Sequence, residues 1–276
     1  MSTHPVRPGT AGRYEALFAR LPAGEAAFIP FLTLGDPTPA DSARLIDAVI
    51  RGGADALELG LPFSDPVADG PVIQAAAVRA LGAGTTLADC WHLIAAVRAR
   101  HPELPIGLLG YANLAFRQGL DGFYAAVARA GADSVLLADV PAAEAGPFQA
   151  AAEAAGVAQV LIAPPNADGG RLRRIAGQSR GYTYVTSRGG VTGDDGRTDP
   201  GLADRLAVLA AAGGAPAVLG FGISTPAHVR AAAAAGARGV IAGSALVRRV
   251  AEGVTDLAGT AAGLERAVRG FKDATA

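Results

Sequence analysis

Three carboxylates fall within one short stretch, Glu58 to Pro71, which reads ELGLPFSDPVADGP. Glu58 stands in an apolar run that predicts a buried strand, and Asp65 and Asp69 follow in the loop after it. Because burial disfavours the ionised form of a carboxylate, we expect the pKa of Glu58 to rise from about 4.3 toward neutrality, as suits a general acid. The alternative is a structural Glu58, bonded to a neighbouring strand or paired with an arginine.

The two aspartates of this loop also have a plain explanation, because Asp-Pro and Asp-Gly pairs are common in turns. The loop, however, contains Pro62, Pro66 and Pro71. A proline-rich loop has little conformational freedom, so side chains on it are held in place, as an active site requires. The context therefore favours a functional reading of this loop.

A helix–glycine–strand pattern recurs along the chain and indicates the fold. It is found in residues 52–60, 130–140, 154–165 and 234–244. Further short apolar runs predict buried strands within residues 27–35, 104–111, 181–187 and 216–222. Thr38-Pro39 and Thr225-Pro226 are typical helix starts. Eight strands alternating with helices predict an α/β protein, a single-domain (β/α)8 TIM barrel. The alternative is a doubly wound open sheet, which would usually carry a G-x-G-x-x-G turn after its first strand. The sequence has no such turn there.

Glycine-rich loops follow three late strands, at residues 187–193, 220–224 and 242–246. Glycines let backbone amides approach an anion, and helix starts after strands seven and eight commonly bind phosphate in such barrels. These loops predict a phosphorylated substrate, although tight turns alone would also use glycine. The long polar stretch from Ser187 to Pro200 is interpreted as a lid over the substrate, with a disordered surface loop as the alternative.

Composition narrows the classes of partner. The net charge is −1 with dispersed Lys and Arg, which argues against nucleic acid or an anionic membrane as a partner. Cys90 is the single cysteine, so an internal disulfide is excluded, and no spacing suggests a metal site. The N-terminus shows no apolar segment typical of a signal peptide. The stretch Leu206–Val229 is uncharged and long enough for a membrane span, but glycines and prolines interrupt it, so it is interpreted as a helix end, a strand and a turn. We expect a cytoplasmic protein.

The motifs FIPFLTLGDP, ELGLPFSDPVADGPVIQ, ADSVLLADVP, GYTYVTSRGGVTG, GFGIS and AGSAL occur in this order in the chain. Together they resemble the successive motifs of the tryptophan synthase alpha subunit family. The resemblance runs from about Arg13 almost to the C-terminus, so we expect a flexible N-terminal extension over residues 1–12 and one barrel domain over residues 13–276.

The resemblance implies a retro-aldol cleavage of indole-3-glycerol phosphate to indole and glyceraldehyde 3-phosphate, a lyase reaction of tryptophan biosynthesis that needs no cofactor. By motif position, Glu58 is expected to protonate indole C3 and to assist removal of the proton from the adjacent hydroxyl. Asp69 is expected to accept the indole N–H and to stabilise the positive charge on the protonated ring.

Further roles follow from the resemblance. The residues expected at the indole and on the lid are Phe31, Leu109, Leu136, Tyr184 and Thr192. The residues expected at the phosphate are Gly193, Gly222, Gly243 and Ser244. The residues expected to meet a tryptophan synthase beta subunit, in an alpha-beta-beta-alpha heterotetramer, are Asp65, Pro66 and Asn113.

Three other hypotheses stay open at this point. The chain could be a stand-alone lyase that releases free indole without a partner, or a non-catalytic allosteric partner of the beta subunit. It could also be another barrel enzyme acting on sugar phosphates, such as an isomerase or epimerase. A buried Glu58 argues against a purely non-catalytic partner, because a buried carboxylate costs stability.

Overall fold

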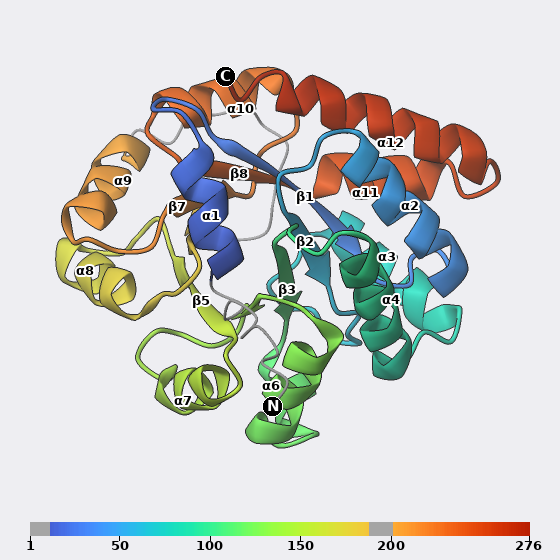
Figure 1. The fold of residues 1–276 in the computed structure, drawn as a ribbon, viewed down its shortest axis with the longest axis horizontal. Helices are drawn as coiled ribbons and strands as arrows, with labels where there is room; N and C mark the ends of the chain where they lie inside the picture. Colours follow the sequence, from blue (N-terminus) through green and yellow to red (C-terminus); the bar gives the residue numbers. More distant parts are fainter. Residues whose placement is uncertain (1–11, 188–200) are drawn as a thin grey trace, which may run out of the picture.

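The computed structural model describes residues 12–187 and 201–276 of the chain. Within these residues, parallel strands pair in sequence order and close into a barrel, the last strand pairing with the first (Figure 1). The predicted (β/α)8 barrel is therefore confirmed. The strands are β1 (Ala27–Thr33), β2 (Leu57–Gly60), β3 (Ile106–Gly110), β4 (Ser134–Leu137), β5 (Ala158–Ala163), β6 (Thr183–Thr186), β7 (Ala217–Gly220) and β8 (Gly239–Ala242).

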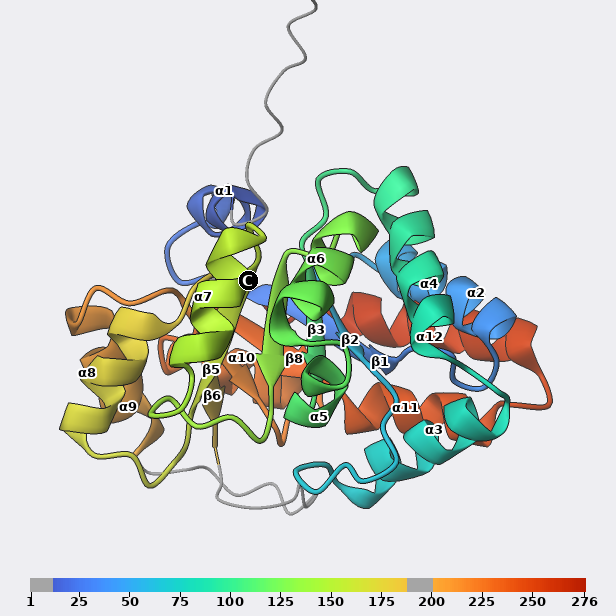
Figure 2. The same ribbon diagram turned by 90° about the horizontal axis from the view of Figure 1, so that it is seen from below.

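Helices surround the barrel, and the described chain has more of them than the eight predicted (Figures 1 and 2). The additional ones precede β1, double the helical connection after β2 and β3, and follow the last barrel helix. The helices are α1 (Gly12–Arg20), α2 (Pro39–Arg51), α3 (Pro71–Gly82), α4 (Leu87–Arg100), α5 (Ala112–Phe116), α6 (Leu120–Ala130), α7 (Gly146–Ala154), α8 (Gly169–Gln178), α9 (Leu202–Ala211), α10 (Pro226–Ala234), α11 (Ser244–Glu252) and α12 (Leu257–Lys272).

The local signals at the helix ends act as the sequence indicates. The side chains of Thr38 and Thr225 accept hydrogen bonds from backbone amides in the first turns of α2 and α10. Gly131 ends α6 with a φ of +87°, a left-handed conformation that glycine adopts without strain. These residues therefore mark where α2 and α10 begin and where α6 ends, shortly before β4.

Two apolar layers fill the molecule. One lies between the strands and the surrounding helices. The other fills the barrel itself, where Ile29 and Val160 from the strands pack in one cluster with Tyr14, Leu17 and Phe18 of α1. Figure 2 shows α1 at one end of the barrel and α5 at the other. Helix α1 thus forms the floor of the barrel, and the opposite end is left for a site.

Two aspartates bind the barrel together near this floor. Asp55 accepts a hydrogen bond from the backbone N–H of Phe28 at 2.8 Å, and Asp133 accepts one from that of Ile106 at 2.7 Å. Each stands two residues after a glycine that follows a helix, in the recurring pattern of the sequence. Asp133 is also paired with Arg98 at 2.6 Å and Arg13 at 2.7 Å. These bonds link the beginnings of neighbouring strands.

The stretch Leu206–Val229 spans the end of α9, strand β7 and the start of α10, as its glycines and prolines indicate. Across residues 12–187 and 201–276, no single helix is long and apolar enough to cross a membrane. Helices α3 and α4 taken together are long and apolar enough for a span, but the two helices are bent by 103° relative to each other.

Replacing Asp133 should destabilise the fold strongly. Asp133→Ala leaves Arg98 and the N–H of Ile106 without this partner in a largely buried place, so we expect the free energy of unfolding to fall by roughly 3–5 kcal/mol in urea titrations. The control is Asp47→Ala, which removes the exposed ion pair with Arg100 and should cost at most about 1 kcal/mol. Equal losses for the two variants would contradict a role for Asp133 in joining the strands.

Candidate active site

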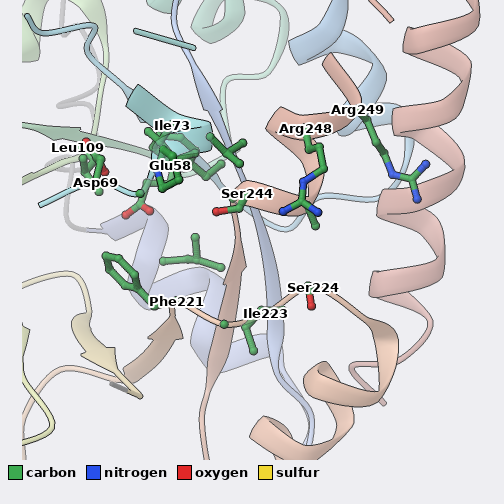
Figure 3. A pocket seen from close by; sticks show the side chains of 18 of the residues that line it. Glu58, Asp69, Ile73, Leu109, Phe221, Ile223, Ser224, Ser244, Arg248 and Arg249 are labelled. Atoms are coloured by element: carbon green, nitrogen blue, oxygen red, sulfur yellow. The ribbon is translucent and has the colours of Figure 1, made fainter. Parts of the chain in front are cut away.

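A cavity of about 570 Å³ opens among the loops that leave the strands, opposite the floor. Its size suits a small organic ligand. Eight residues predicted for the site lie in its wall: Phe31, Glu58, Asp69, Leu109, Tyr184, Gly222, Gly243 and Ser244. Figure 3 shows Glu58, Asp69 and Leu109 grouped on one side and Ser244 and Ser224 on another. The cavity therefore has two chemically different ends.

Glu58 projects from β2 into the barrel and is 1% exposed. Its Oε1 accepts a hydrogen bond of 2.7 Å from the hydroxyl of Tyr182. Its Oε2 has no hydrogen-bond partner among the described residues. Burial raises the pKa of Glu58 to about 7, the bond from Tyr182 lowers it, and the nearby charge of Asp69 raises it. The carboxyl group can therefore both give and take a proton near neutral pH.

Asp69 is held by Tyr111, whose hydroxyl donates a 2.8 Å hydrogen bond to Oδ2. The same hydroxyl accepts a hydrogen bond from the backbone N–H of Ala68, and the ring of Tyr111 stacks on Phe63 at 5.2 Å. Partial burial raises the pKa of Asp69, and the bond from Tyr111 lowers it. One tyrosine thus fixes the loop and favours the ionised form of its carboxylate.

The helix that follows Asp69 is also anchored. Arg79 on α3 forms a bidentate ion pair with the buried Asp36 of the loop after β1, with both N–O distances at 2.8 Å. Gln74 of the same helix donates a hydrogen bond to the carbonyl of Asp69. Two-point arginine–carboxylate pairs fix orientation as well as distance. The loop is therefore positioned from both sides, in accord with its proline content.

Glycines at two strand ends make room for the aromatic walls. A Cβ atom at Gly60 would meet the ring of Phe31 at 2.6 Å, and one at Gly220 would overlap the ring of Tyr184. Both rings line the cavity beside Glu58. The next residue after β7, Phe221, has a φ of 65°, which is unusual for a residue with a side chain, and its ring contacts that of Tyr184 at 5.8 Å. An apolar pocket for a flat ring results.

The far end of the cavity is formed by the starts of α10 and α11. Gly222, Ser224 and Thr225 precede the first turn of α10, and Gly243 and Ser244 begin α11; all five line the cavity. Helix N-termini carry partial positive charge and unpaired N–H groups, so two of them at one cavity end favour an anion.

Other predicted residues lie elsewhere. Leu136 is buried in the barrel next to Leu109, to which it is paired in register, but it does not line the cavity. Asp65 and Asn113 are exposed outside the cavity, with Pro66 partly exposed beside Asp65. The expectations for Thr192, Gly193 and the lid Ser187–Pro200 fall on residues 188–200, outside the described residues except for Ser187.

Sequence reasoning missed Tyr182, Tyr111 and Phe221. A signal existed for Tyr182, because it stands two residues before the predicted Tyr184 and alternate strand residues share a face. Nothing in the sequence paired Tyr111 with Asp69, since the contact joins residues 42 positions apart.

This fold and this site define a (β/α)8-barrel enzyme whose cavity combines two carboxyl groups, an aromatic wall and two helix starts. The family model described as "Tryptophan synthase alpha chain" matches residues 18–276. The chain belongs to the tryptophan synthase alpha chain family.

Relatives agree over nearly the whole chain. It is 53% identical to the tryptophan synthase alpha chain of Shewanella oneidensis over 97% of both chains, and 56% identical to that of Klebsiella pneumoniae over 86% of this chain and 88% of the relative. Among solved structures, the tryptophan synthase alpha subunit of Legionella pneumophila has a TM-score of 0.82 at 30% identity and covers 95% of this chain and 98% of its own. A chain of the tryptophan synthase complex from Pyrococcus furiosus has a TM-score of 0.81 at 32% identity, with 90% and 98% covered.

The raised pKa of Glu58 predicts a pH-dependent stability. The folded chain keeps this proton up to about pH 7, whereas the unfolded chain loses it near 4.5, so stability falls as pH rises between these values. Glu58→Gln cannot ionise and should be more stable than the wild type above about pH 8, by on the order of 3 kcal/mol.

The measurement is urea unfolding of both proteins near pH 5 and near pH 8.5. The advantage of Glu58→Gln should be small at the lower pH and grow toward the higher one. An advantage that does not change with pH would show that Glu58 titrates alike in the folded and unfolded chains.

Proposed function

We propose that Glu58 and Asp69 are the residues with which this chain cleaves indole-3-glycerol phosphate to indole and glyceraldehyde 3-phosphate. The observation that carries the assignment is a buried carboxyl group with a pKa of about 7 in the wall of a cavity that also holds a second carboxylate. The aromatic wall suits the indole ring, and the helix starts at the far end suit the phosphate.

The first step is a proton transfer to carbon. Neutral Glu58 donates its proton to C3 of the indole, the carbon that carries the glycerol phosphate chain. The ring becomes cationic, with its positive charge shared by the ring nitrogen. Asp69 accepts the N–H of that nitrogen and stabilises the charge, which is an electrostatic role suited to an ionised group.

The second step breaks the carbon–carbon bond. The Glu58 carboxylate takes the proton from the hydroxyl on the carbon next to C3, and the electrons of that O–H bond form the aldehyde carbonyl. The pair from the broken bond returns to the ring and neutralises it, which gives indole. Glu58 has then given and regained one proton, so no other acid or base is needed.

The two carboxylates divide these roles by environment. Glu58 lies deeper, and its burial outweighs the bond from Tyr182, so it stays protonated until near neutral pH. Burial also raises the pKa of Asp69, which is less deeply buried, while the bond from Tyr111 and the nearby start of α3 favour its ionised form. Separation of two pKa values by environment is a common way to assign the acid and the charged group in a site.

Removing either carboxylate should suppress indole release. Glu58→Gln should lower turnover of indole-3-glycerol phosphate by about 10²–10⁴-fold, as loss of an acid–base group does. Asp69→Asn should lower it on the order of 100-fold, through loss of charge stabilisation. Indole is measured from the purified chain, and circular dichroism checks the fold. The control Asp121→Asn, an exposed acid on α6, should keep the wild-type rate; near-full turnover in Glu58→Gln would remove Glu58 from the mechanism.

The chain works as the alpha subunit beside a tryptophan synthase beta subunit, and we propose that this partner binds at the loop after β2 and at α5. Asp65, Pro66 and Asn113 lie there, and so do the exposed apolar side chains of Val67 and Phe116, at 76% and 58% exposure. Large exposed apolar side chains beside polar ones are typical of interaction surfaces. The bond from Ala68 to Tyr111 joins this surface to the catalytic loop.

A charge placed on this surface should weaken the partnership. Val67→Asp should reduce the stimulation of indole release by a beta dimer at least about tenfold at limiting dimer, because an unpaired charge would be buried. The control is Val254→Asp, in the turn between α11 and α12. Equal stimulation of both variants would place the partner elsewhere. Fast release by the wild type with no stimulation would indicate a stand-alone lyase.

We also propose that residues 13–276 form one barrel domain after an extension of residues 1–12, and that this biosynthetic enzyme acts in the cytoplasm. Contacts of α1 with the barrel interior and of α12 with α2 support a single domain. The single buried Cys90 is consistent with a reducing compartment.

A further inference from the structure

The phosphate end of the cavity includes a charged side chain that neither glycine motifs nor helix starts account for. Arg248 of α11 lines the same cavity as Gly222, Gly243 and Ser244. The acids Glu58 and Asp69 lie toward the other side (Figure 3). The cavity wall therefore carries two acids where the ring is expected, and two arginines together with Glu252 on the helix where the phosphate is expected.

The position of Arg248 on its helix directs it to this end. It stands four residues after Ser244, so both occupy one face of α11, one turn apart. Side chains on a helix lean toward its N-terminus, which here faces the cavity. Figure 3 shows the guanidinium of Arg248 beside Ser244 and on the side of Ser224.

We propose that Arg248 binds the substrate phosphate together with the starts of α10 and α11, and so sets the preference of the enzyme for a phosphorylated substrate. This inference rests on the proposed function. A phosphate monoester carries nearly two negative charges at neutral pH, and the backbone amides of two helix starts supply only partial positive charge. A guanidinium adds a full charge and a planar pair of donors that matches two phosphate oxygens.

Two charged residues near Arg248 on α11, Glu252 and Arg249, determine how the test is designed. Glu252 follows Arg248 by four residues and also borders the cavity, so it is the carboxylate on this helix that competes for the guanidinium. Arg249 also borders the cavity, but it is the next residue after Arg248 and stands about 100° further round the helix. In Figure 3 its guanidinium extends toward α12, away from Ser244. Arg249 therefore provides a control of equal charge and nearly equal position.

The experiment compares Arg248→Gln, Arg248→Lys and Arg249→Gln with the wild type in two assays. Steady-state cleavage of indole-3-glycerol phosphate gives KM and kcat separately. Calorimetric titration with inorganic phosphate gives a dissociation constant that does not depend on catalysis. Arg248→Gln should raise KM and the phosphate dissociation constant by about tenfold each and keep kcat within about twofold. Arg248→Lys should recover part of both losses, and Arg249→Gln should change neither more than about twofold.

The outcomes separate this inference from the proposed function. Equal constants for Arg248→Gln and Arg249→Gln would overturn it, and so would a fall in kcat with no change in KM. If the wild type releases no indole with or without a beta dimer, the proposed function fails, and the phosphate titration still decides whether Arg248 binds the anion.

Discussion

The site depends on one interaction, the hydrogen bond from Tyr182 to a carboxyl group placed inside a parallel β-barrel. Barrel strands are covered on both faces, so a Glu58 in the middle of a strand has no access to bulk water. Such a group is tolerated because it can stay neutral, and its neutrality makes it a proton donor. Tyr182 limits this effect, since its bond favours the ionised form and keeps the pKa of Glu58 near neutrality.

The remaining parts of the site are arranged around that group. The rings of Phe31 and Tyr184 occupy space that Gly60 and Gly220 leave open, which places an apolar wall beside Glu58. Asp69 is held by Tyr111 on a loop that Arg79 and Asp36 anchor through α3. The starts of α10 and α11 line the opposite end, where their N–H groups favour an anion. One cavity can thus orient a molecule that is a ring at one end and a phosphate at the other.

The sequence predicted the barrel because helix ends, capping residues and apolar runs are local signals, and each of them holds in the structure, as Thr38 and Gly131 illustrate. It also predicted Glu58, whose burial follows from its own strand. It did not predict the partners of the acids, because the bond from Tyr182 to Glu58 joins residues 124 positions apart and depends on the register around the whole barrel. The same reason explains Leu136, which pairs with Leu109 but does not line the cavity.

The floor made by α1 has a consequence for the path of the product. Tyr14, Leu17 and Phe18 fill the barrel from below, so a product formed in the cavity leaves on the side of the strand ends. Val67 and Phe116 are exposed on that side. A beta subunit docked at the proposed surface would meet indole at a local concentration far above that in bulk solution, because the indole would have only a short distance to diffuse. The closed floor of the barrel thus restricts the exit of indole to the end of the barrel where the strands end.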